Sequence, residues 1–365
     1  MNNLKNPISE EIEGLGGDED ANWGDYPIDT LLIRHETRTV HDVVRRIDQG
    51  SFVMNPDFQR AFIWDDDKQS KLIESVLMRI PLPVFYLAEN SAGRMIVVDG
   101  LQRLSTFDRY INKDLRLKLP NQQELHNKKF EDLSPKLQNR IEDCNLVLYI
   151  VDAKVPERAR LDIFERVNSG VPLTRQQMRN SLYMGPATAF LKEEASIDLF
   201  KQATGNSLQS DSMRDREFVN RFCAFRLLDL DSYSNKDEMD GFLARALTHM
   251  NHLPPAELTA LSADFRMSLR NNFVVFGEHS FRKHRPNQER RGVLNASLWD
   301  VMSTGLSNIP EKAVLERKDK LVSRFYALMD NKPFIQSITY GPNSAKQVRH
   351  RFEVMRRTLA EVFDA

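Results

Sequence analysis

The stretch RMIVVDGLQRLSTFDRYI, from Arg94 to Ile111, decides how this sequence is interpreted. Its first half, MIVVD, is a short apolar run that is typical of a buried strand, and it ends at an Asp-Gly turn. Leu101, Leu104 and Phe107 then follow at helical spacing, with Ile111 one turn further on. The stretch therefore predicts a strand, a tight turn and an amphipathic helix that packs its apolar side inward.

Arg103 lies in the first turn of that helix, where the free N–H groups already carry partial positive charge and disfavour a cation. A bound phosphate would reverse this preference, because it accepts bonds from the N–H groups and from the guanidinium. Gly100 would then let the backbone approach the ligand. The alternative is an ordinary helix start, capped by Asp99 and by Gln102 in a capping box, with Arg103 incidental. The residues alone leave both interpretations open.

Two further segments carry polar side chains that a folded core does not require. NPDFQRAFIW places Gln59 and Arg60 in a proline-interrupted loop, where they would hold a second phosphate or a base edge, or form ordinary surface. FERVNSGVPLTRQQMRNSL places Asn168 at a helix end and Arg179 and Asn180 in the next helix. Helix capping accounts for Asn168 but says nothing about Arg179 and Asn180.

Mixed helix and strand patterns run from Pro27 to about Gly185. We expect a hairpin of strands over 84–89 and 95–99. The other elements expected here are a strand over 145–153 and helices over 39–50, 65–80, 101–111, 156–170 and 173–185.

Beyond Gly185 the strand patterns fade and amphipathic helices follow one another. They are expected over 215–230, 239–251, 257–277, 295–306, 313–330 and 344–363. The predicted fold class is therefore α+β, with an α/β domain over 27–185 followed by an all-α helical domain over 186–365.

The first 26 residues form an acidic leader. Seven acids face a single lysine, Lys5, and Gly14, Gly16 and Gly17 add flexibility. This composition predicts a disordered or loosely docked leader. The alternative is a self-inhibitory arm whose negative charge lies on a basic groove.

Composition limits the function classes. The chain has 365 residues, a net charge of −1 and 41% hydrophobic residues, so overall charge makes no case for nucleic acid, although local patches remain open. Its two cysteines, Cys144 and Cys223, lie in apolar stretches and predict reduced, buried thiols and no metal site. There is no apolar run of membrane-spanning length and no signal peptide. We expect a cytoplasmic protein.

Four motifs in this order resemble a known family: PDFQR, RIPLPVFYL, VVDGLQRLSTF and IFERVNSGVPLTRQQMRNSLY. They resemble the ParB/sulfiredoxin-like DGQQR family, also known as domain of unknown function 262, which forms the N-terminal part of GmrSD-like modification-dependent restriction enzymes. The resemblance implies a ParB/sulfiredoxin-like fold for the N-terminal domain. It also implies phosphate binding at Asp99, Gly100, Gln102 and Arg103. The first glutamine of the family signature is Leu101 here, so its role does not carry over.

The resemblance implies a nucleotide-binding protein, and we expect a nucleoside triphosphatase that acts in bacterial defence against foreign or modified DNA. Asp99 and Arg103 are the expected catalytic residues, with a nucleoside triphosphate as ligand and Asp99 holding Mg²⁺ or a water. Gln59 and Arg60 would close over the nucleotide. The remaining nucleotide contacts are expected from Asn168, Arg179 and Asn180.

Two rival functions stay open. One is a nucleotide-switched DNA-binding or regulatory protein without turnover, and the other is a ParB-like endonuclease that uses the same pocket. The larger relatives add a His-Asn-His nuclease domain, which is absent from this sequence. His279 and His284 lack its order of residues and are expected to be solvated loop histidines. A second copy of the chain or a defence-system protein is the expected protein partner.

Two basic segments lie in the helical domain, over 282–291 and 346–357, each with five basic residues against one acid. The second segment would present its charges on one exposed helix side. Arg349, Arg356 and Arg357 are the candidate nucleic-acid contacts. The alternatives are a solvated face or an intramolecular partner for acids, the leader included.

Overall fold

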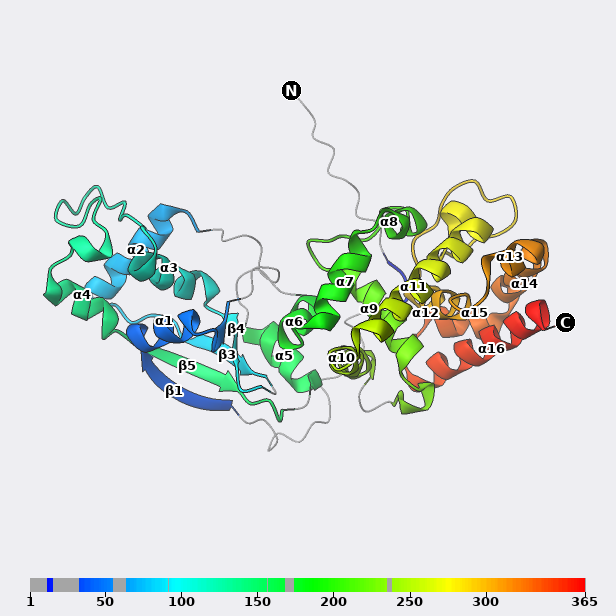
Figure 1. The fold of residues 1–365 in the computed structure, drawn as a ribbon, viewed down its shortest axis with the longest axis horizontal. Coiled ribbons are helices and arrows are strands. Elements are labelled where there is room, and N and C mark those ends of the chain that lie inside the picture. Colours follow the sequence, from blue (N-terminus) through cyan, green and yellow to red (C-terminus); the bar gives the residue numbers. More distant parts are fainter. Residues whose placement is uncertain are drawn as a thin grey trace, which may run out of the picture. The chain divides into compact units, whose positions relative to one another are not determined.

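The computed structural model describes residues 12–15, 33–54, 64–90, 92–155, 157–167, 174–234 and 238–364. Contacts divide the chain into two units (Figure 1). The N-terminal unit comprises Tyr26–Leu182. The helical unit comprises Tyr183–Ala365 together with Met1–Asp25.

A five-stranded mixed sheet organises the N-terminal unit, in the strand order β1-β5-β3-β4-β2. β3 and β4 form the expected antiparallel hairpin, whereas β3 and β5 run parallel, as do β2 and β4. The elements are β1 (Ile33–Thr39), α1 (Val40–Asp48), β2 (Phe52–Val53), α2 (Asp66–Leu77), β3 (Phe85–Glu89), β4 (Met95–Asp99), α3 (Leu101–Asn112), α4 (Pro135–Glu142), β5 (Asn145–Val151), α5 (Glu157–Val167) and α6 (Arg175–Leu182).

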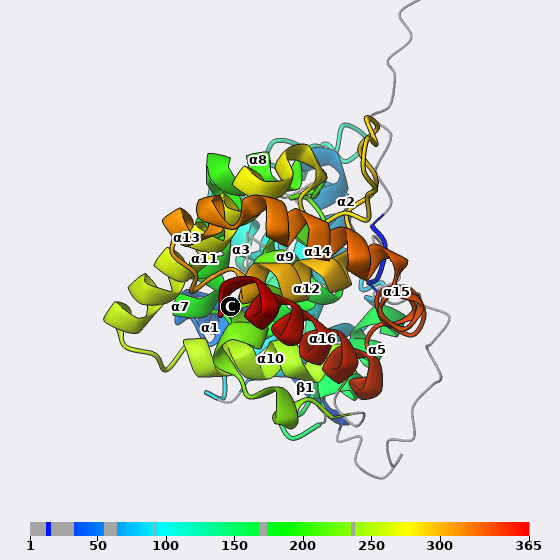
Figure 2. The ribbon, with the colours of Figure 1, turned by 90° about the vertical axis from the view of Figure 1, so that its right-hand side faces the viewer.

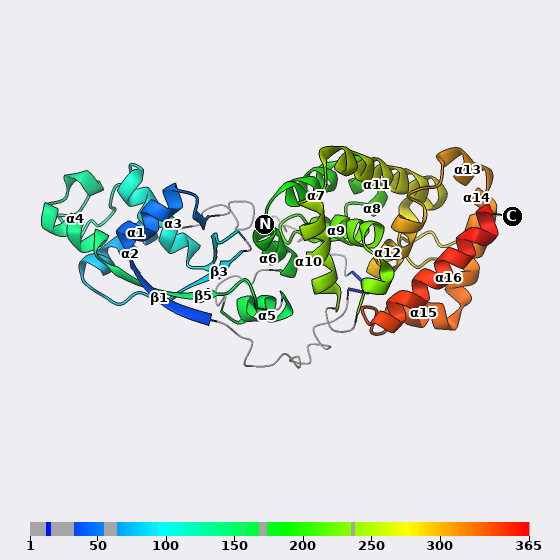
Figure 3. The same cartoon turned by 60° about the horizontal axis from the view of Figure 1, so that its bottom comes forward.

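Helices α1 to α4 lie on one side of this sheet (Figures 1 and 3). Alternate residues of β5, namely Leu146, Leu148 and Ile150, point into the core on that side. Leu104 and Phe107 of α3 lie in the same core, which confirms the inward-facing side expected for this helix. Burial of these apolar stripes fixes α3 against the sheet, and so positions the residues at its start.

The helix starts and stops follow from local chemistry. Asp65 caps α2, its carboxylate accepting from Lys68 N at 2.8 Å, and Thr39 caps α1 in the same way. Gly50 follows α1 with a φ of +69°, a conformation that glycine adopts without strain. The expected helices over 39–50 and 65–80 are thereby confirmed. The sequence interpretation missed β1 and α4.

The second unit is all-helical, which confirms the α+β class with an all-α part after it. Its helices are α7 (Pro186–Ser196), α8 (Asp198–Thr204), α9 (Arg214–Leu227), α10 (Glu238–Met250), α11 (Pro255–Phe276), α12 (Ala296–Gly305), α13 (Glu311–Glu316), α14 (Lys318–Asp330), α15 (Lys332–Thr339) and α16 (Ala345–Phe363). Figure 2 looks onto α12, α14 and α16. The single helix expected over 313–330 is two helices, and α15 was not expected.

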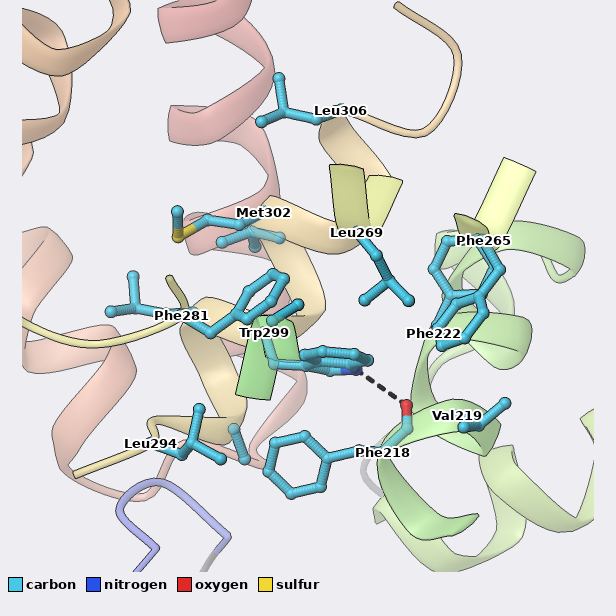
Figure 4. Close-up of a cluster of buried hydrophobic side chains, with 14 of the residues drawn as sticks. Phe218, Val219, Phe222, Phe265, Leu269, Phe281, Leu294, Trp299, Met302 and Leu306 are labelled. Atoms are coloured by element: carbon cyan, nitrogen blue, oxygen red, sulfur yellow. Dashed lines mark hydrogen bonds between the residues drawn. The ribbon is translucent and has the colours of Figure 1, made fainter. Parts of the chain in front are cut away.

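The core of the helical unit is built around Trp299 on α12 (Figure 4). Its ring lies against Phe218 and Phe281, and its indole N–H donates to the Phe218 carbonyl at 2.8 Å. The large residue is therefore buried with its one polar atom satisfied, as a stable core requires.

A charged triad lies inside the same unit. Asp300 on α12 accepts from Arg221 Nε and Nη2 at 2.8 and 2.6 Å, and from Arg351 Nη2 at 2.8 Å. All three side chains are fully buried. The triad joins α9, α12 and α16 through one carboxylate and leaves a net positive charge in the interior.

Part of the acidic leader is docked on the helical unit, as the expectation of a loosely docked leader allows. Residues 12–15 are described, and Ile12 and Leu15 pack against the helical core. Glu13 N donates to the Leu294 carbonyl and Ala296 N donates to the Glu13 carbonyl, both at 2.8 Å. These contacts tie this part of the leader to the start of α12.

No helix in the described part of the chain combines the length and the apolar character that crossing a bilayer requires.

Candidate functional site at the β4–α3 corner

The corner between β4 and α3 is shaped by Gly100. Gly100 is the N-cap residue of α3 and has left-handed backbone angles, with a φ of +101°. A Cβ atom added here would lie 2.3 Å from Cδ1 of Phe85. The corner therefore requires glycine for the turn and for close packing on the first residue of β3.

Arg103 is held by several protein groups. Its guanidinium donates to Asp99 Oδ2 at 2.9 Å, to the Val84 carbonyl at 3.1 Å and to the Pro83 carbonyl. It also lies 4.2 Å from the centre of the Phe85 ring. Only 11% of the side chain is exposed. The idea of an incidental, unpaired cation in the first turn is thus wrong, because Arg103 ties the start of β3 to the end of β4.

Burial sets the electrostatics of this corner. It lowers the pKa of Arg103, since a guanidinium is less stable away from water, while the charge and hydrogen bond of Asp99 act in the opposite direction. Asp99 keeps 28% of its side chain exposed. The pair therefore has one side against the protein and one side towards solvent.

The expected capping box is absent. Asp99 gives its carboxylate to Arg103, and among the described residues the N-cap position of α3 is Gly100, which makes no side-chain cap bond. Gln102 instead accepts from Trp64 N at 3.3 Å, which connects α3 to the approach of α2. The first N–H groups of a helix have no intrahelical partner, so this start is suited to an anionic ligand.

An aromatic row that the sequence interpretation missed leads to Asp99. Tyr86 pairs with Asp99 across β3 and β4, and with Tyr149 across β3 and β5. The two tyrosine rings are stacked, with centroids 5.7 Å apart, and His35 lies 5.5 Å beyond Tyr149. Only the strand register brings these residues together, and sequence spacing did not reveal it.

The other expected nucleotide contacts fall into two groups. Gln59, Arg60 and Asn168 lie outside the described residues. Arg179 and Asn180 are buried on α6, where Arg179 Nε donates to Gln176 Oε1 at 3.0 Å and Gln176 Nε2 donates to Asn180 Oδ1 at 3.3 Å. These contacts place Arg179 and Asn180 in a buried polar network along one helix.

The start of α6 agrees with the sequence. Thr174 caps this helix, because Gln177 N donates to its hydroxyl at 3.2 Å. The Gln177 side chain in turn accepts a hydrogen bond from Thr174 N at 2.7 Å, which completes a capping box.

Residues 40–184 match the family model of the GmrSD restriction endonuclease N-terminal domain. The N-terminal unit contains a GmrSD-type domain. Comparison with curated proteins and with solved structures found no match. The GmrSD-type domain includes the β4–α3 corner and α6, and it supports a restriction-type defence protein. Residues 185–365 lie outside the match.

The helical unit beyond the GmrSD-type domain holds the expected nucleic-acid contacts. Arg356 and Arg357 are exposed on α16. Arg349 is also exposed but donates to the carbonyls of Asp231 and Tyr233 at 3.3 and 3.2 Å. The expectation that every basic residue of this segment lies on the exposed side is wrong for Arg351, which is buried against Asp300.

The other basic segment meets intramolecular partners. Arg282 is fully buried and donates to backbone carbonyls, among them that of Thr204 at 2.7 Å. Lys283 pairs with Glu13 of the leader, and Arg285 pairs with Asp330 at 2.7 Å. The alternative of an intramolecular partner for acids is therefore confirmed for Lys283 and Arg285.

The histidine expectation needs a correction. His284 is buried and stacks on Phe325 with centroids 4.8 Å apart, so it is not a solvated loop residue. His279 stacks on its other side at 4.9 Å. Burial lowers the pKa of His284, which favours the neutral ring. Among the described residues, no group of three His, Cys, Asp or Glu side chains is arranged to hold a metal ion.

Proposed function

We propose that the GmrSD-type domain binds a nucleoside triphosphate at the start of α3 and that the protein uses it in defence against foreign or modified DNA. The observation that carries the proposal is the uncapped start of α3. A helix of this length with no side-chain cap presents N–H groups and a positive dipole end to an anion.

The contacts around the β4–α3 corner support different roles for Gly100, Arg103 and Asp99. Gly100 and Arg103 shape the turn, since Gly100 packs on Phe85 and Arg103 holds the carbonyls of Pro83 and Val84. Asp99 retains an exposed side for Mg²⁺ or a water. Arg103 contacts phosphate by exchanging one carbonyl partner for a phosphate oxygen, which would keep its ion pair with Asp99.

The surroundings offer contacts for the rest of a nucleotide. Tyr86, directly across from Asp99, gives with Tyr149 a flat aromatic surface on which a base can stack. Gln59 and Arg60 belong to the segment between Met54 and Trp64, and Trp64 N is bonded to Gln102 at the start of α3. Asn168, Arg179 and Asn180 would complete the binding site.

Hydrolysis is the proposed activity, because positioning and charge stabilisation supply most of what phosphoryl transfer needs. Asp99 and Arg103 are its proposed catalytic residues. The two rivals are a nucleotide-switched regulator without turnover and a nuclease that uses the same corner. In the helical unit, Arg349, Arg356 and Arg357 are the proposed contacts to DNA, and a second copy of the chain or a defence-system protein remains the proposed protein partner.

The test combines binding and turnover on the full chain. Calorimetric titration with each of the four nucleoside triphosphates, with and without Mg²⁺, should find at least one that binds. Phosphate release with and without DNA then separates a hydrolase from a regulator, and nicking of plasmid DNA detects a nuclease. Absence of binding to every nucleotide would contradict the proposal.

A further inference from the structure

A second polar site lies in the GmrSD-type domain, away from the start of α3. A surface cavity of about 510 Å³, open to solvent, lies between the end of α2, the helix α4 and the start of β5. Its volume falls in the range of small-ligand sites, which is roughly 300–1,000 Å³. None of the expected nucleotide contacts lines it.

One wall of this cavity is a polar stripe on α4. Lys136, Asn139, Arg140 and Asp143 line the cavity and recur at the spacing of one helix face. Arg140 donates to the Leu77 carbonyl at 3.0 Å, which fixes α4 against the end of α2. The stripe therefore offers a firmly held set of hydrogen-bonding groups.

Arg79 lines the opposite wall and sits in a strained conformation. It follows α2 with a φ of +58°. Arg79 N donates to the Val76 carbonyl and Ile80 N to the Ser75 carbonyl, both at 2.9 Å, which is the Schellman arrangement at a helix end. Glycine is the usual residue at this position. An arginine kept here at the cost of strain points to a role for its side chain.

The charges define the kind of ligand. Three cations, Arg79, Lys136 and Arg140, face one carboxylate, Asp143, so the cavity carries a net positive charge. The amides of Asn139 and Asn145 add neutral donors and acceptors. Burial raises the pKa of Cys144, so this lining thiol stays protonated and takes no nucleophilic part.

We infer that this cavity binds a phosphorylated small molecule of nucleotide size, with Arg79 and Lys136 on its phosphate and the amides of Asn139 and Asn145 on its polar remainder. The site is distinct from the proposed one at α3, and it is connected to that site through the backbone. The lining residues Pro81 and Leu82 lead directly into Pro83 and Val84, whose carbonyls Arg103 holds.

The most informative variant is Arg79→Gly, because it should weaken ligand binding without lowering the stability of the fold. Glycine relieves the left-handed strain, so the melting temperature should stay unchanged or rise by up to about 3 °C. The loss of a charged contact should weaken binding of pyrophosphate to the full chain at least tenfold. Lys136→Gln should weaken it to a similar extent. Lys71→Gln, an exposed cation on α2 that does not line the cavity, is the matched control and should bind normally.

Calorimetric titration tests this inference. The ligands are pyrophosphate, mixed nucleoside monophosphates and a single-stranded oligonucleotide. Normal pyrophosphate binding by Arg79→Gly, equal weakening by Lys71→Gln, or binding of the oligonucleotide alone would overturn the inference. The α3 site has a separate measurement, the exchange of the amides of residues 101–103 with a nucleoside triphosphate present. Either site can therefore fail without the other.

Discussion

Two arginine sites in this protein, one in each unit, hold their structures together in different ways. Arg103 lies at the edge of the N-terminal core, shares one carboxylate and two carbonyls, and keeps 11% of its side chain exposed. Arg221 and Arg351 are fully buried and share Asp300. A partly exposed guanidinium such as that of Arg103 can exchange a protein partner for a ligand. The buried triad cannot, because the loss of one member would leave a buried charge unpaired.

The largest effect is expected at the triad. Asp300→Asn removes the negative charge of the triad and leaves the buried guanidinium groups of Arg221 and Arg351 without a carboxylate. We expect a loss of about 3–5 kcal/mol in the stability of the helical unit. Calorimetric melting of the full chain measures it. The matched control is Asp264→Asn, which breaks the half-exposed pair with Arg226 and should cost at most about 1 kcal/mol. Equal effects of the two changes would show that burial of the triad is unimportant.

An intermediate effect is expected at the β4–α3 corner. Arg103→Ala removes the bonds to Asp99, Pro83 and Val84, and should cost about 1–3 kcal/mol in the N-terminal unit. Arg45→Ala, which breaks a half-exposed pair with Asp42, is the control and should cost at most about 1 kcal/mol. A variant Arg103→Ala that melts like the wild type would show that the corner does not depend on this arginine.

A smaller effect is expected from the leader. Deleting residues 1–25 removes the paired backbone bonds between Glu13 and the start of α12, and should cost about 1–2 kcal/mol in the helical unit. Deleting residues 1–11 keeps Ile12–Leu15 and serves as the control, with an unchanged melting temperature. If the two deletion variants have the same melting temperature, the contacts of residues 12–15 make no net contribution to stability.

The smallest effect is expected from His284. Burial lowers the pKa of this histidine in the folded protein, so the unfolded chain binds the proton more readily below about pH 6.5, the ordinary pKa. Stability should therefore be full above that pH and fall as the pH drops below it. His284→Phe should flatten this acid limb of the melting profile, whereas the exposed control His252→Gln should leave it unchanged. A profile that is identical in all three proteins would contradict the assignment.

The structural elements that depend on neighbouring residues could be predicted from the sequence. The hairpin of β3 and β4 and the helices α2 and α6 were predicted, because they follow from patterns of residues a few positions apart. β1 was missed because its sequence, IRHETRT, lacks the apolar alternation of a buried strand. It is an edge strand that pairs with β5 alone in the described sheet.

The candidate site shows where such inference stops. The strand–turn–helix around Gly100 was predicted, but two partners of Arg103, the carbonyls of Pro83 and Val84, lie about 20 residues earlier, and the RIPLPVFYL motif that contains them does not reveal this contact. Arg351 looked exposed from its helical spacing, yet its partner Asp300 is 51 residues away. Partners at such distances are set by tertiary packing, which local patterns do not encode.

The central claim is that the uncapped start of α3 receives the phosphates of a nucleotide. Hydrogen–deuterium exchange of the full chain, measured at residue resolution with and without a saturating nucleoside triphosphate and Mg²⁺, tests it most directly. We predict slower exchange of the amides of residues 101–103 when the nucleotide is present, because phosphate oxygens would accept their hydrogen bonds. Unchanged exchange at these amides, with the nucleotide bound to the chain, would contradict the claim and place the nucleotide elsewhere.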